Sequence, residues 1–289
     1  RAYLKQHSEK ELKEHYYNFP GINSQNREAQ ALLRIALITV FEEKAKKANK
    51  DKDPNEKRLA NSMIKVLFDD LKTEFQPAQL TNYVLVRLGD YLRERTGTPR
   101  NALPYYEEVV KREDLSYRFN AHFGIADILG GGASLADKQK AIDSLEHVIR
   151  NAPQRKQKER GLYRIVTIFA EKGDWKDVTT RAKQYLTTEG YRHYAGFVSL
   201  LLSQSYDKQG MREDAIASYS KTMGAFTGQI AVSAPAVTRI MELTWARKNG
   251  NDPQMAYEVG YKYSKSTKRL YHQMEDAEKK LWDAVGKLV

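Results

Sequence analysis

The stretch "LLSQSYDKQGMREDAIASYSKTM" (201–223) has a helical pattern of apolar residues on both sides of one glycine. Gly210 follows the first apolar run, and Ala215 opens the second run five residues later. Glycine is favoured just after a helix because it adopts the left-handed conformation at little cost. The acidic residues Glu213 and Asp214 suit the start of the next helix, where the helix dipole favours carboxylates. The stretch therefore predicts two helices joined by a tight turn, with the small Ala215 where they cross closely.

The same unit recurs along the chain. Residues equivalent to Ala215 open four further predicted second helices, and they are Ala102, Ala141, Val178 and Ala256. Glycine precedes two of them by five residues, at Gly97 and Gly173. The residue numbers give successive gaps of 39, 37, 37 and 41 between these five positions. Helix pairs that recur at such a spacing are typical of helical repeat proteins.

The first helix of each pair carries a large apolar residue followed by a smaller one. These residue pairs are Leu88–Gly89, Phe123–Gly124, Ile165–Val166, Leu202–Ser203 and Leu243–Thr244. Together with the glycine turn and the aromatic Tyr219, they make residues 77–265 resemble the tetratricopeptide repeat (TPR) family. TPR units have about 34 residues, so the units here are longer and less even, similar to the irregular repeats of bacterial envelope members. The resemblance implies an all-α fold, a right-handed α-solenoid of about six stacked antiparallel helix pairs.

The repeat pattern divides the chain into three parts. We expect an irregular N-terminal segment at residues 1–25, with one short helix and a loop, and a TPR-like helical repeat domain at 26–266. The first long helices of that domain are expected at about 26–48, 55–75 and 77–95. We expect a C-terminal capping segment at 267–289, because stacked repeats leave an apolar face at each end. Its helix, 267–288, has one apolar stripe, formed by Leu270, Met274, Ala277, Leu281, Val285 and Leu288.

The composition excludes some classes of protein and leaves the compartment open. Cysteine is absent, which excludes a disulfide framework, thiolate catalysis and zinc–cysteine sites. The most apolar run, residues 31–41, is too short to cross a bilayer and is interrupted by Arg34. Because the sequence starts at Arg1, we expect that an upstream segment was removed. We expect the periplasm or cell envelope as the location, with the cytoplasm as the alternative.

No stretch carries a motif for catalysis or for binding a cofactor or metal ion. The glycine run "LGGGAS" (129–134) follows a predicted helix and lacks the Lys-Ser/Thr of a nucleotide-binding loop. The six histidines form no cluster with metal-ligand spacing. Neighbouring acids such as Asp69 and Asp70 point apart on a helix. We therefore predict a non-catalytic protein without a cofactor.

The candidate binding residues follow from the repeat. In a stacked array of this type the first helices line the concave face, so equivalent positions form columns along a groove. The resemblance implies that these columns hold ligand contacts. The candidate residues are Tyr83, Arg87, Arg118, His122, Arg160, Tyr163, Arg164, Phe197 and Gln204. The same columns continue to Thr238 and Glu242 in the next first helix.

The character of these residues predicts the partner. Arginine supplies planar donors for carboxylates, and Tyr163 and Phe197 supply apolar contact area. We predict a protein–protein interaction scaffold that binds a peptide or protein segment, acidic and with large apolar residues. The net charge of +11 and the 18 tyrosines leave an alternative, a nucleic-acid-binding repeat protein. An enzyme on a helical scaffold is the third alternative, and the sequence favours it least.

Overall fold

The computed structural model describes residues 9–18, 26–132, 134–245 and 252–288, and every regular element within them is a helix. The predicted all-α fold class is confirmed for these residues. None of the helices described is long and apolar enough to cross a membrane. The chain divides into two compact units, residues 1–144 and 145–289, and the boundary lies inside α8 (Leu135–Asn151).

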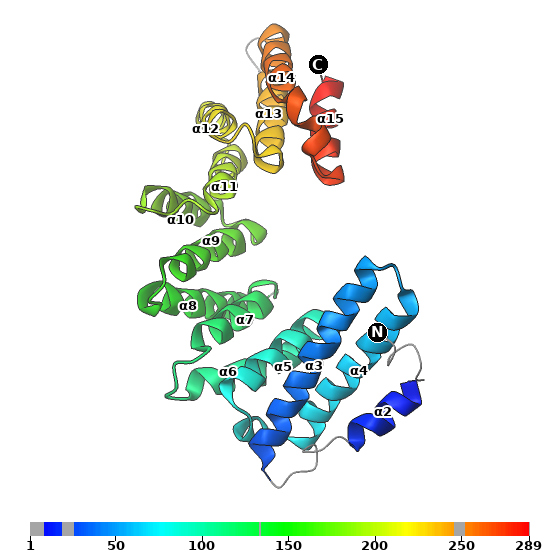
Figure 1. Ribbon diagram of the computed structural model, residues 1–289. Coiled ribbons are helices and arrows are strands. Elements are labelled where there is room, and N and C mark those ends of the chain that lie inside the picture. The colour runs from blue at the N-terminus through cyan, green and yellow to red at the C-terminus, as the bar shows by residue number, and fades with distance from the viewer. Residues whose placement is uncertain (1–8, 19–25, 133, 246–251, 289) are drawn as a thin grey trace. The chain divides into compact units, whose positions relative to one another are not determined.

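The helices of each unit follow one another along the chain (Figure 1). Those of the first unit before α8 are α2 (Glu9–Tyr17), α3 (Arg27–Lys50), α4 (Pro54–Glu74), η1 (Pro77–Gln79), α5 (Asn82–Arg95), η2 (Pro99–Ala102), α6 (Leu103–Lys111) and α7 (Arg118–Gly130). Those of the second unit after α8 are α9 (Arg155–Glu171), α10 (Trp175–Thr187), α11 (Ala195–Lys208), α12 (Arg212–Ala225), α13 (Ile230–Trp245), α14 (Pro253–Thr267), η3 (Lys268–Gln273) and α15 (Asp276–Leu288).

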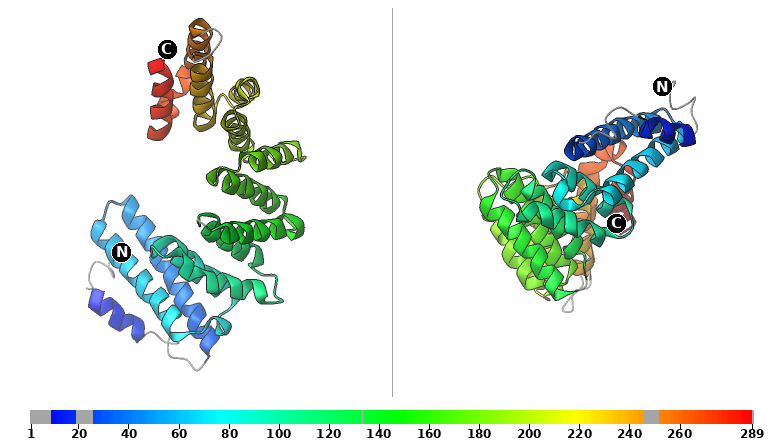
Figure 2. Two further views of the ribbon diagram at one scale, coloured as in Figure 1. Left: turned by 180° about the vertical axis from the view of Figure 1, so that it is seen from behind. Right: turned by 90° about the horizontal axis from the view of Figure 1, so that it is seen from below.

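The first unit is built on the antiparallel pair of α3 and α4, which lie side by side in Figures 1 and 2. Capping side chains fix where both helices begin. The Asn26 side chain accepts a hydrogen bond from the backbone N–H of Ala29 (3.1 Å), and Asp53 accepts one from Glu56 (3.0 Å). Pro54 occupies the first turn of α4, where its missing N–H costs nothing. Helix α5 then packs against both members of the pair.

The contact between α5, α6 and α7 depends on one tyrosine and two glycines. Tyr106 of α6 is fully buried, and its hydroxyl donates to Asp90 Oδ1 at 2.6 Å. A Cβ atom at Gly89 would lie 2.7 Å from the Tyr106 ring, and one at Gly124 would lie 2.4 Å from it. The small members of two predicted residue pairs therefore leave the space that this ring fills.

In the second unit, each helix from α9 to α14 packs against the next one along the chain. Helix α11 also contacts α9 and α13, so alternate helices touch one another. Helix α15 packs against α13 and α14. Val285 of α15 and Met274 are buried in one cluster with Tyr263 of α14 and Val237 of α13. The predicted terminal helix thus covers an apolar surface of this unit.

The repeat spacing marks buried positions and turns correctly. The five residues that open the predicted second helices are all buried, and they are Ala102, Ala141, Val178, Ala215 and Ala256. The turn glycines Gly97, Gly173 and Gly210 have φ of 68°, 75° and 75°, in the region that favours glycine. Helix α2 is the expected short N-terminal helix, and most of the loop expected after it lies outside the described residues.

Two predicted helices have different bounds in the structure. The helix predicted at 267–288 is interrupted, because residues 268–273 form a 3₁₀ helix and Met274 is extended, with φ −72° and ψ 143°. The break lets α15 fold back so that Met274 and Val285 are buried together. The helix predicted at 77–95 starts only at Asn82, because the Thr81 hydroxyl caps it by accepting from the N–H of Val84 (3.4 Å).

Ala215→Leu is expected to lower the free energy of unfolding by about 1–3 kcal/mol, the usual result of overpacking a filled core. Ala215 is fully buried at the contact between α11 and α12, in one cluster with Leu200 and Tyr219. Ala217 of the same helix is exposed, so Ala217→Leu serves as the control. Urea denaturation of both variants measures the difference, and equal stability would show that the close crossing is elsewhere.

Candidate functional site

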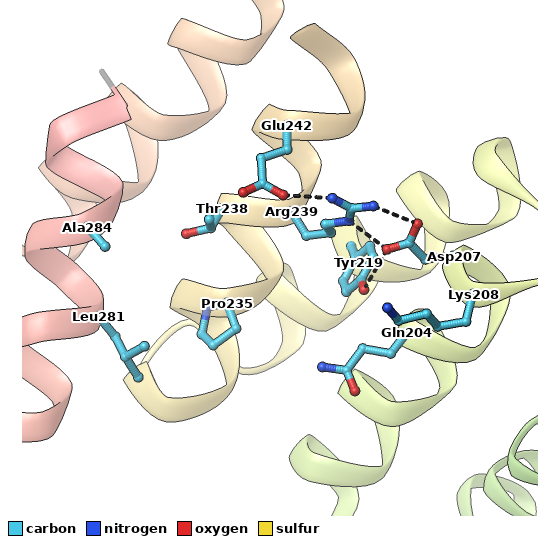
Figure 3. A pocket seen from close by; sticks show the side chains of 10 residues that line it. All are labelled: Gln204, Asp207, Lys208, Tyr219, Pro235, Thr238, Arg239, Glu242, Leu281 and Ala284. Atoms are coloured by element: carbon cyan, nitrogen blue, oxygen red, sulfur yellow. Dashed lines mark hydrogen bonds and ion pairs between the residues drawn. The ribbon is translucent and has the colours of Figure 1, made fainter. Parts of the chain in front are cut away.

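The second unit contains an open cavity of about 560 Å³ between α11, α13 and α15 (Figure 3). The residues that line it are Gln204, Asp207, Lys208, Tyr219, Pro235, Thr238, Arg239, Glu242, Leu281 and Ala284. Helical periodicity explains why they converge. Pro235, Thr238 and Glu242 are three to four residues apart and therefore share one face of α13. Gln204 and Lys208 are four apart on α11, and Leu281 and Ala284 are three apart on α15.

An ionic network ties α13 to α11 at the wall of this cavity (Figure 3). The Arg239 guanidinium donates to both oxygens of Asp207, from Nε to Oδ2 at 2.6 Å and from Nη2 to Oδ1 at 3.0 Å. Its Nη1 donates to Glu242 Oε2 at 2.7 Å. The hydrogen bonds to Asp207 are the main reason that the pKa of Arg239 is raised. Paired donors of this kind hold both side chains in a fixed geometry.

Tyr219 completes the polar side of the cavity. Its ring is buried, and its hydroxyl lies 3.5 Å from Asp207 Oδ2. Burial is the larger cause, and the Asp207 carboxylate the second, of a raised pKa for the Tyr219 hydroxyl. The phenol therefore stays protonated, and it faces the carboxylate as a donor. The cavity wall carries two cationic and two acidic side chains in all, so its charges balance.

Three polar side chains of the lining are left to bond a ligand. Gln204, Lys208 and Thr238 form no side-chain hydrogen bond or ion pair with any residue that the structure describes. Opposite them, Leu281 and Ala284 face α13 from α15, and 37% of Leu281 is exposed. The cavity thus offers an amide, a hydroxyl and an amine on one side and apolar surface on the other. This combination suits a ligand with both amide groups and an apolar side chain.

Five of the residues predicted to bind a partner belong to the second unit. Gln204 lines the cavity, as do Thr238 and Glu242 of the same predicted columns. Phe197 is 42% exposed and shares a face of α11 with Gln204, seven residues away. Tyr163 stacks on Tyr194, with ring centroids 4.2 Å apart.

The two arginines of the second unit that were predicted to bind a partner lie on α9. Arg160 is exposed. The Arg164 side chain is only partly exposed, because its Nη1 donates to Thr167 Oγ1 at 3.0 Å and lies 3.7 Å from Glu171 Oε1. Neither Arg160 nor Arg164 is among the residues that line the cavity.

The other four predicted residues belong to the first unit. Tyr83 packs against Tyr117, with ring centroids 5.4 Å apart, and Arg87 pairs with Glu42 at 2.8 Å. The Arg118 guanidinium donates to the backbone carbonyl of Arg112. His122 is only 7% exposed, because α7 is enclosed by α5 and α6 and buried nearly all round. Its column in the repeat therefore did not predict its exposure.

Sequence reasoning missed the Asp207–Arg239 pair and the contribution of α15. Asp207 and Arg239 are 32 residues apart, and no short motif links them. Leu281 belongs to the predicted apolar stripe of the terminal helix, and in the structure it lines the open cavity. Ala284 gave no signal, because an alanine on a helix has no distinctive pattern.

Comparison with known proteins does not extend these observations. No protein-family model matches the chain, and no curated protein shows significant sequence similarity to it. The TPR resemblance therefore stays a prediction. Within the described residues, no group of three or more histidine, aspartate or glutamate side chains could hold a metal ion.

Proposed function

We propose that the protein is a non-catalytic scaffold that binds a peptide or protein segment in the cavity between α11, α13 and α15. The observation that carries this proposal is the combination of unbonded polar side chains and apolar surface in one cavity. A peptide backbone carries a donor and an acceptor at nearly every residue, which Gln204 and Thr238 can satisfy. An apolar side chain of the segment would lie against Leu281, Ala284 and Pro235.

The energetics favour such a ligand. Burial of one leucine-sized side chain contributes about 1.5–3 kcal/mol. The Asp207–Arg239–Glu242 network holds its part of the wall in place before the ligand arrives, and a wall that is already ordered reduces the entropy cost of binding. Because burial of the apolar side chain is the main favourable contribution, a peptide that lacks this side chain should bind the cavity much more weakly.

We also propose that the helix pairs form an α-solenoid of the TPR type. Support comes from the second unit, where α11 contacts α9 and α13 as well as its neighbours along the chain. In such an array the cavity would be the last part of a groove that continues past Gln204 to Phe197 and toward α9. Arg160 and Arg164 would then add the preference for an acidic segment that the sequence predicts.

Salt dependence separates the contributions of the cavity and of these arginines. The charges of the cavity wall balance, so binding confined to the cavity should change little with ionic strength. Binding that also uses Arg160 and Arg164 should weaken as salt screens the attraction to an acidic segment. A nucleic-acid ligand, the alternative from the sequence, would show a steep linear fall of log affinity with log salt.

Ala284→Phe is expected to weaken peptide binding about tenfold or more, because its ring would occupy the space of the ligand's apolar side chain. Ala284 is exposed, so the larger ring should leave the melting temperature unchanged. Peptides selected from a displayed random library with the wild-type chain serve as probes, and fluorescence anisotropy measures their dissociation constants.

Ala217→Phe on α12 is the matched control, because Ala217 is exposed and does not line the cavity. It should bind the selected peptides within about twofold of the wild type. Equal affinities of Ala284→Phe and the wild type would contradict the proposed site. A library that yields no binding peptide would contradict the proposed function.

A further inference from the structure

Besides the cavity of the second unit, the first unit also contains a cavity, of about 600 Å³, between α3, α4 and α5. Four cationic side chains line it, and they are Lys46, Lys57, Arg87 and Arg95. They come from three helices, one from α3, one from α4 and two from α5. Glu42 is the one acidic residue among the lining residues that the structure describes.

The sequence places these residues together by simple periodicity. Glu42, Lys46 and Asn49 are four and three residues apart, so they follow one face of α3. Because α3 and α4 are antiparallel neighbours, the end of this face meets the first turns of α4. There the Lys57 ammonium donates to Asn49 Oδ1 at 2.7 Å. Arg87 and Arg95 are eight residues apart on α5, which spaces them along one side of that helix.

The acidic groups nearby do not neutralise the cavity. Glu42 is already held by Arg87, whose Nη2 lies 2.8 Å from Glu42 Oε2. Lys46 also pairs with the exposed Glu43 at 2.7 Å. Lys57 and Arg95 form no ion pair with a carboxylate of the described residues. The Arg87 Nε is buried without a hydrogen-bond partner in the described part of the chain. The lining therefore keeps a net positive charge and spare donors.

We propose that this cavity binds the phosphate group of a small soluble molecule. Like charges from three helices repel one another, and an anion between them removes that repulsion. The guanidinium of arginine matches phosphate oxygens with several donors, and lysine adds a point charge. The donors reach the cavity from three helices, which suits a tetrahedral dianion better than a flat carboxylate. This site lies in a different unit from the proposed peptide site, so the two can be tested separately.

Isothermal titration calorimetry of the full chain with inorganic pyrophosphate tests the proposal. Lys57→Glu and Arg95→Glu should each weaken binding about tenfold or more, because each removes a charged donor and adds a repelling carboxylate. Arg58→Glu is the control, since it makes the same change of net charge at the next residue of α4. Arg58 is exposed and does not line the cavity, because adjacent helix residues point about 100° apart.

Less than about a twofold change in Arg58→Glu, with the losses expected for the other two variants, would support the site. Equal weakening in all three variants would overturn it, because general attraction to a basic protein would then explain the binding. No measurable binding of millimolar pyrophosphate to the wild type would overturn it as well. Co-sedimentation with phosphatidylglycerol vesicles distinguishes the source. Vesicle binding that Lys57→Glu abolishes and Arg58→Glu retains would support the phosphate site but assign the phosphate to a lipid headgroup.

Discussion

Tyr106→Ala is expected to lower the free energy of unfolding by about 3–5 kcal/mol, the range for removing a large aromatic side chain from a core. The Tyr106 ring is fully buried against Gly89 of α5 and Gly124 of α7. Because both backbones approach the ring so closely, they cannot move in to fill the space that alanine would leave. Chemical denaturation followed by circular dichroism measures the loss. A change below about 1 kcal/mol would show that the ring does not hold α5, α6 and α7 together.

Two further variants separate the parts of this contact. Tyr106→Phe keeps the ring but loses the hydrogen bond to Asp90, so it should cost only about 1 kcal/mol. Gly124→Ala should destabilise the wild type, because its Cβ would lie 2.4 Å from the ring. In the Tyr106→Ala background the same change should be neutral or stabilising, since the ring is gone and alanine favours the helix. Additive effects in this double-mutant cycle would contradict the direct contact.

Glu159→Ala is expected to lower the free energy of unfolding by about 2–4 kcal/mol, because it leaves several donors without their acceptor. Glu159 of α9 is buried, and its Oε1 accepts from the Tyr185 hydroxyl and from the N–H groups of Arg192 (2.7 Å) and His193 (2.6 Å). The Tyr185 oxygen in turn accepts from the N–H of Tyr194 at 2.9 Å. One carboxylate thus fixes the chain that leads into α11.

The contribution of Glu159 to the free energy of unfolding depends on pH in a direction that its pKa determines. Burial raises the pKa of Glu159, but the Tyr185 hydroxyl and the backbone N–H groups outweigh it, so the pKa lies below its ordinary value of 4.5. The stabilisation is therefore complete above pH 4.5 and is lost as the pH falls through the lowered pKa. The stability difference between the wild type and Glu159→Gln should shrink in that acid range. Glu189→Gln, at an exposed position, is the control. A difference that stays constant with pH would contradict the lowered pKa.

Local pattern was sufficient to predict much of the fold. Ala102, Val178 and Ala215 are buried where the repeat spacing placed them, and Gly97 and Gly210 have the positive φ of a turn. These features depend on neighbours within about one helix pair, and the sequence expresses them directly. Gly89 and Gly124 were recognised as small positions for the same reason.

The candidate site depends on contacts between distant segments, which sequence pattern does not reveal. The cavity exists because the helical conformation ends at Met274, and the chain then turns back so that α15 packs against α13. Its wall is held by Asp207 and Arg239, which only the packing of α11 on α13 brings together. Gln204 lines the cavity, whereas His122, another of the candidate binding residues, is buried. The repeat spacing therefore predicted buried positions such as Ala215, but not which side chains of the first helices stay accessible.

Methyl NMR of the full chain with a selected peptide bound tests the proposed peptide site most directly. Labelled threonine, leucine and alanine methyl groups report on both units at once. Thr238, Leu281 and Ala284 line the cavity, so their signals should shift as the peptide is added. Those of Leu32 and Ala36, exposed on α3 of the first unit, should not. Peptide binding that leaves the signals of Thr238, Leu281 and Ala284 unchanged would contradict the proposed site.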